Sequence, residues 1–171
     1  MGNWDIQLDR SITSDDDWRN EMYRNACHEA AHAVVAERVG ARVNLIRLTD
    51  WEEMIETKTA GDIDYTISTM PAHQAATMRL TIALAGPAFE SLLHQGRTYK
   101  GCGSDMDDAR QVVSMMTTKN ATSEEKLERF LEFASQLVVE KWPLILAIGK
   151  RLAYKGEITG RQVRNMMAKL A

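Results

Sequence analysis

Residues 26–34 read Ala-Cys-His-Glu-Ala-Ala-His-Ala-Val, in the middle of a longer stretch with helical spacing. Apolar residues recur there every three or four positions, which predicts a helix over 15–39 with one buried face. The residues of that face are Trp18, Met22, Ala26, Ala30, Ala33 and Val34. Ser14 with Asp17 resembles a capping box before the helix. Gly40 is a natural stop after it.

The pair His28 and His32 predicts a metal site on this helix. Residues four apart share a helix face, so two imidazoles can bind one ion from the same side. Glu29 is rotated by about 100° from His28, which puts a carboxylate beside the two ligands. This pattern is typical of metallopeptidases that use a metal-activated water. We expect one zinc ion per chain and Glu29 as general base, against the alternative that the pattern is chance.

A catalytic zinc site needs a third protein ligand, and the residues alone leave several open. Arg38 stands where the metzincin pattern has its third histidine, so that class is excluded. His73 and His94 are isolated, and an isolated histidine is more often a surface or hydrogen-bonded residue. Asp105 follows a glycine-containing stretch that permits a close approach, whereas Glu90 could bind the metal or orient a ligand. The other candidates are Cys102, Asp107 and Asp108.

Length and composition indicate one ordinary globular domain. The chain has 171 residues, of which 44% are hydrophobic and 26% charged, and its net charge is −3. That balance gives no reason to expect nucleic acid or an anionic membrane as a partner. No stretch approaches the roughly 20 apolar residues of a membrane span, and the first residues do not resemble a signal peptide. We expect a cytoplasmic protein with an N-terminal arm, 1–13, and one domain, 14–171.

The rest of the chain predicts a mainly α fold with a small β element. Short strands are expected over 43–48 and near 63–67. A helix should run over 72–93, with Pro71 before its first turn and Gly86-Pro87 as an internal break.

Three further helices follow in the prediction. Ser104 should cap a helix over 105–117. Thr122 with Glu125 should cap a long helix that bends near Trp142-Pro143 and ends at Gly156. Thr159 with Gln162 should open a short final helix.

Three segments in order resemble the peptidase domain of FtsH-type ATP-dependent zinc proteases. Residues 28–33 read HEAAHA, residues 83–90 read ALAGPAFE, and residues 101–109 read GCGSDMDDA. The C-terminal part, with Leu152 and 156–160, is also similar to the end of that domain. The resemblance covers nearly the whole chain, about 20–170.

The resemblance implies a helical zinc-metallopeptidase domain. It implies that His28 and His32 bind zinc, that Asp105 is the third ligand and that Glu29 is the catalytic base. It also places the family's helix glutamate at Glu90, where we expect it to support a ligand.

The chain departs from the family in several places. Ala31 replaces a glycine, Phe89 replaces a small residue, and the acidic stretch over 51–56 does not match, so substrate contacts are not carried over. The phosphate-loop pattern of the family's ATPase module is missing. We therefore expect a free-standing metalloendopeptidase that cleaves unfolded proteins or peptides, with or without a separate unfoldase. The family forms rings of six, and whether this chain forms a homo-oligomer is left open.

Two other functions compete with this prediction. The first is a non-catalytic binding or regulatory module that keeps the metal only as a brace. The presence of Glu29 argues against it, because a module without catalysis has no use for the base. The second is a metal hydrolase that acts on a bond other than the peptide bond, which the metal chemistry permits.

Overall fold

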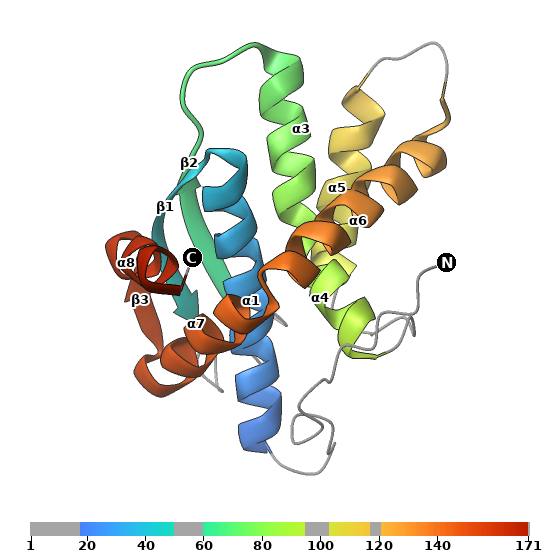
Figure 1. The fold of residues 1–171 in the computed structure, drawn as a ribbon. Helices are drawn as coiled ribbons and strands as arrows, with labels where there is room; N and C mark the ends of the chain where they lie inside the picture. The colour runs from blue at the N-terminus through green and yellow to red at the C-terminus, as the bar shows by residue number, and fades with distance from the viewer. Residues whose placement is uncertain (1–17, 50–59, 95–102, 117–120, 171) are drawn as a thin grey trace.

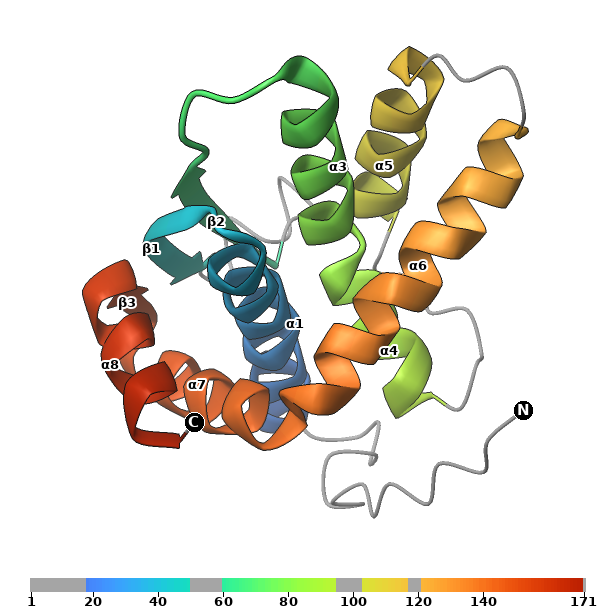
Figure 2. The ribbon, with the colours of Figure 1, turned by 45° about the horizontal axis from the view of Figure 1, so that its top comes forward.

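The computed structural model describes residues 18–49, 60–94, 103–116 and 121–170, and it has the predicted mainly α fold with a small β element. In Figures 1 and 2, α1 runs through the middle, with the sheet, α7 and α8 on one side and α3, α4, α5 and α6 on the other. The elements are α1 Trp18–Val39, β1 Arg42–Leu48, β2 Gly61–Thr66, α3 Ala72–Ala83, α4 Ala85–Leu93, α5 Gly103–Met115, α6 Ser123–Glu140, α7 Trp142–Lys155, β3 Glu157–Thr159 and α8 Gly160–Leu170.

The central helix α1 is buried on most of its circumference over its second half. Four of the residues predicted on its buried face have no exposed surface, namely Ala26, Ala30, Ala33 and Val34. Met22 was predicted on that face and is instead 37% exposed, because the helix extends beyond the core at that end. Gly40 ends the helix as predicted, with a φ of 95°. The predicted cap at Ser14 and the arm 1–13 lie outside the described residues.

The small sheet has the strand order β2-β1-β3, and both pairs are antiparallel. The predictions for β1 and β2 are confirmed within two residues of their bounds. The three-residue β3 was not predicted, since it is too short to show alternation. β2 forms one edge of the sheet among the described strands, and it starts at Gly61 beside α1.

The predicted helix over 72–93 is two helices that meet at Leu84. The prediction put the break at Gly86-Pro87, but both residues lie in the first turn of α4. Pro87 explains why the break falls at Leu84. Its ring clashes with a helical carbonyl group four residues earlier, and that residue is Ala83, the last residue of α3. At the break, the backbone N–H of Leu84 donates to carbonyl oxygens of Leu80 and Ile82 in the last turn of α3.

The later helices follow the predicted order with shifted bounds. α5 begins at Gly103, so Ser104 lies inside its first turn and does not precede the helix. The capping box of Thr122 with Glu125 is present at the start of α6. The predicted bend near Pro143 is a break at Lys141 between α6 and α7. The hydrogen bonds between Thr159 and Gln162 open α8 as predicted.

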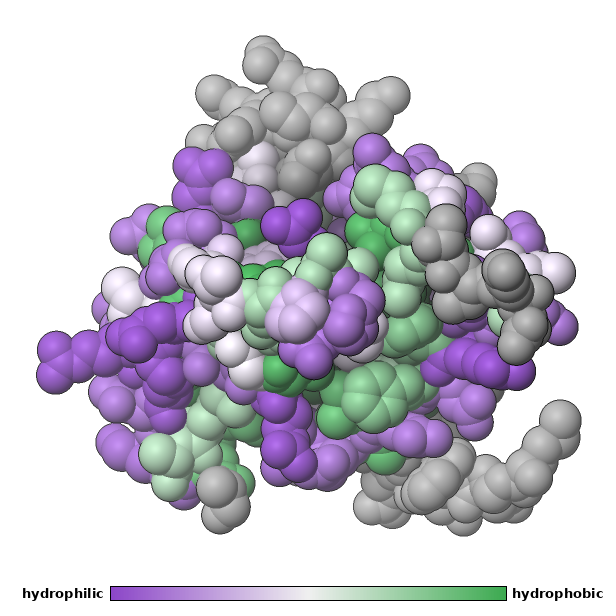
Figure 3. Space-filling model, turned by 90° about the horizontal axis from the view of Figure 1, so that it is seen from above, coloured by the Kyte–Doolittle hydropathy of each residue, from purple (hydrophilic) through white to green (hydrophobic). Residues whose placement is uncertain are grey.

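The surface is mixed in character. Seen from above, hydrophilic side chains occupy the left and right margins and hydrophobic ones reach the surface between them (Figure 3). No helix within the described ranges is long and apolar enough to cross a membrane.

Candidate metal centre

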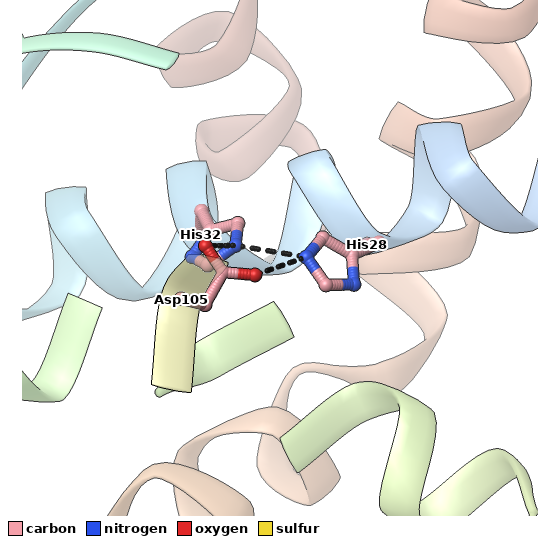
Figure 4. Close-up of side chains that lie close together, drawn as sticks. All are labelled: His28, His32 and Asp105. Atoms are coloured by element: carbon pink, nitrogen blue, oxygen red, sulfur yellow. Dashed lines mark hydrogen bonds and ion pairs between the residues drawn. The ribbon is translucent and has the colours of Figure 1, made fainter. Parts of the chain in front are cut away.

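Two histidines from one face of α1 form the floor of the site. His28 Nε2 and His32 Nε2 lie 3.1 Å apart, as the four-residue spacing predicts. Both residues are buried, with 9% and 4% of their surface exposed. Figure 4 shows the two rings with their Nε2 atoms turned toward each other and toward Asp105.

Asp105 comes to the histidines from the first turn of α5. Its Oδ2 lies 3.0 Å from His28 Nε2 and its Oδ1 lies 3.7 Å from His32 Nε2, although 77 residues separate Asp105 from His28. Its side chain keeps 24% of its surface exposed, so the cluster is open on this side. Burial works to raise the pKa of Asp105, but the charge and hydrogen bonds of the two histidines outweigh it and hold the pKa well below its ordinary value.

These three residues could hold a metal ion. Within the described parts of the chain they form a group whose ligand atoms all lie within 4.8 Å of one another. The other candidate ligands do not belong to this group. Asp107 pairs with Arg110 on the surface, and His73 and Asp108 are exposed. Cys102 lies outside the described residues.

The ring of His32 is held from behind by a group that the sequence did not indicate. His32 Nδ1 lies 2.7 Å from the carbonyl oxygen of Ile82. A carbonyl only accepts, so His32 donates its Nδ1–H and directs the lone pair of Nε2 into the cluster. Ile82 lies in the last turn of α3, directly before the break at Leu84.

Glu90 lies behind His28, as predicted for a residue that supports a ligand. Its Oε1 lies 3.6 Å from His28 Nδ1, on the side of the ring away from the cluster. Glu90 is 3% exposed and is not part of the cluster, so its alternative role as a metal ligand does not fit this geometry. Two further contacts, from Arg24 and His94, were not predicted for this carboxylate.

Glu29 is buried next to the histidines and below the first residue of β2. It is 7% exposed. Burial raises the pKa of Glu29, the positive charges of His32 and His28 oppose this, and the negative charges of Asp105 and Asp62 add to it. A Cβ built on Gly61 would lie 2.7 Å from Glu29 Cγ, so the glycine provides the space that this side chain occupies.

Gly86 has the same function for the histidines. A Cβ built on it would overlap Nε2 of both His28 and His32. The sequence pattern predicts this glycine as part of a helix break, whereas in the structure it is the residue that lets α4 approach the site. A signal was available, because Gly86, Glu90 and His94 are spaced by four, like Arg24, His28 and His32 on α1.

Phe89, which differs from the family pattern, packs away from the site. Its ring is fully buried and stacks on Trp142 with the centroids 4.9 Å apart. The larger side chain therefore fills the core between α4 and α7.

Comparison with known proteins gives no assignment. No protein-family model matches the chain, and no curated protein matches it significantly. The resemblance to FtsH-type peptidases remains a prediction, and the function has to be argued from the geometry of the site.

Proposed function

We propose that the chain is a zinc-dependent metallopeptidase of the His-Glu-x-x-His type. The observation that carries the proposal is the convergence of two buried imidazoles and one partly exposed carboxylate, with Glu29 buried beside them. Three protein ligands with one open side are the usual arrangement of a catalytic zinc site.

The distances fit zinc. With metal–ligand distances of about 2.0–2.1 Å, two ligand atoms of a tetrahedral site lie about 3.3 Å apart. His28 Nε2 and His32 Nε2 lie 3.1 Å apart, Asp105 Oδ2 lies 3.0 Å from the first and Asp105 Oδ1 lies 3.7 Å from the second. With one ligand atom from each residue, all three atoms lie within 4.8 Å of one another, so a small closing movement brings them to zinc distances. Two imidazoles and a carboxylate are also ligands that zinc commonly takes.

The residues around the ligands have roles that suit hydrolysis. A zinc ion, when bound, would polarise the scissile carbonyl and acidify water at the open position. Glu29 would take the proton from the attacking water on its carboxylate and deliver it to the leaving amine. Glu29 is buried beside the ligands, so its carboxylate is shielded from bulk water.

The edge strand β2 supports a peptide as the substrate. Its first residue, Gly61, lies against Glu29, so this edge strand begins directly beside the base. An extended peptide can add to such an edge through main-chain hydrogen bonds. Unfolded proteins and peptides offer such segments, and folded substrates would require a separate unfoldase. This assignment agrees with the resemblance to FtsH-type peptidases.

The test is degradation of an unfolded, fluorescently labelled protein by zinc-loaded wild type, Glu29→Gln and Glu128→Gln. Glu128 is an exposed glutamate of α6 and serves as the matched control. Glu29→Gln should lose cleavage by about 100-fold or more while it keeps its zinc, because Glu29 is not a ligand. Glu128→Gln should cleave like wild type. If zinc-loaded wild type cleaves no unfolded protein, the metal is a brace and the peptidase proposal is wrong.

A further inference from the structure

Arg24 extends the line of histidines on α1. Arg24, His28 and His32 are spaced by four residues, so all three project from one face of the helix. Glu90 lies over the first two of them, with Oε1 3.8 Å from Arg24 Nε and 3.6 Å from His28 Nδ1. Asp105 lies over the last two. One stripe of basic groups is thus covered by two carboxylates, and only one of these belongs to the metal cluster.

Glu90 is a buried carboxylate that needs a permanent positive charge beside it. It is 3% exposed, and an ionised carboxylate away from water is costly unless it is paired. Among the described residues, the basic groups within ion-pair distance of Glu90 are Arg24, His28 and His94. A histidine whose Nε2 holds a metal is a neutral imidazole, and His94 is charged only when protonated. Arg24 is the one that is always charged.

We propose that Arg24 is a positioning residue for the metal site, because it holds Glu90 in place behind His28. Glu90 then faces the Nδ1–H of His28, which turns Nε2 toward the cluster. Arg24 itself is 7% exposed and is not one of the residues of the metal cluster. A second ion pair of Arg24, at 3.8 Å, is with Glu21, whose side chain is half exposed. Outer partners of this kind fix the tautomer and orientation of a ligand histidine. The inference rests on the proposed zinc site and adds a residue to it.

The experiment measures the zinc dissociation constant of the full chain by competition with a chromophoric chelator. The variants are Arg24→Met, Arg24→Lys and Arg38→Met. Arg38 is the matched control, since it lies on the same helix and pairs with Glu140 at 4.0 Å, but both side chains are about half exposed. Arg24→Met should weaken zinc binding by about 10- to 100-fold, and Arg24→Lys by less because it keeps the charge. Arg38→Met should bind like wild type.

Measuring Arg24→Met in the Glu90→Gln variant as well separates a positioning effect on the metal site from general damage to the fold. In Glu90→Gln the buried negative charge is gone, so adding Arg24→Met should change zinc affinity little further. An equal loss in both backgrounds, or unchanged affinity in folded Arg24→Met, would overturn the inference. If Arg24→Met does not fold, Arg24→Lys in the two backgrounds gives the same comparison. Wild type that binds no zinc would overturn the metal site itself, which is a different result from unchanged affinity in the variant.

Discussion

Gly86 lies against His28 so closely that a Cβ built on the glycine would overlap Nε2 of the ring. The same Cβ would overlap His32 Nε2, so this position of α4 forms a wall of the candidate metal centre. The packing of α4 on α1 therefore depends on the absence of a side chain at one residue.

Gly86→Ala should abolish zinc binding and leave the fold largely intact. The added methyl group occupies the space of the two ligand atoms, and ligand distances that deviate by more than about 0.2 Å no longer suit zinc. Bound zinc and circular dichroism check this. The control is Gly103→Ala on α5, where a Cβ would have no neighbour within 4 Å. Normal zinc affinity in Gly86→Ala would show that α4 does not approach the histidines as described.

Gly61→Ala should give the opposite combination, with zinc retained and cleavage impaired. A Cβ at Gly61 would lie 2.7 Å from Glu29 Cγ and 2.8 Å from the Arg47 carbonyl oxygen, and none of its three nearest atoms belongs to a proposed ligand. Displacement of a catalytic group by about 1 Å can cost on the order of 100-fold in rate. The zinc content and the cleavage rate of Gly61→Ala, measured on the same sample, test this prediction. Loss of zinc in this variant, or full activity, would contradict the assigned place of Glu29.

The local part of the site could be predicted from the sequence, and the long-range part could not. The spacing of His28 and His32 fixes their common face once the helix is known. The approach of Asp105, 77 residues from His28, follows from no local rule, and its selection came from the resemblance. The contact of the Ile82 carbonyl with His32, 50 residues away, follows from no local rule either.

In the fold too, local features could be predicted from the sequence and long-range ones could not. Capping residues gave the starts of α6 and α8, because a cap is a local hydrogen-bond pattern. The strand β3 could not be predicted, since three residues show no alternation and its pairing with β1 crosses more than a hundred positions. The sequence pattern around Gly86 concerns only α4. The glycine is required because a side chain there would overlap His28 and His32 on α1.

Cys27 should resist alkylation in the native protein. Burial, with a smaller contribution from Glu90, raises the pKa of its thiol to about 12 against the opposing hydrogen bond of Tyr23. Near about pH 8 only about one thiol in ten thousand would then be ionised, and the thiolate is the reactive form. Mass spectrometry of Cys102→Ser treated with iodoacetamide tests this with Cys27 as the remaining cysteine. Rapid modification before denaturant is added would contradict the burial of Cys27 between α1 and α7.

Arg164→Met should lower stability without changing the metal site. Arg164 Nη1 donates to Glu37 Oε1 at 2.6 Å and to the Val43 carbonyl at 3.0 Å, which ties α8 to α1 and β1. Loss of these charged hydrogen bonds should cost about 1–3 kcal/mol of the free energy of unfolding. Urea unfolding measures the loss, with the exposed Arg161→Met as control. Equal stability of the two variants would show that the contact contributes nothing.

The most direct test of the metal centre is elemental analysis of zinc-loaded wild type and Asp105→Ala after removal of free metal. The account predicts about one zinc ion per wild-type chain and a large loss in Asp105→Ala, since two histidines alone do not complete a zinc site. Wild type without zinc, or the same zinc content in both proteins, would contradict the assignment of His28, His32 and Asp105 as its ligands.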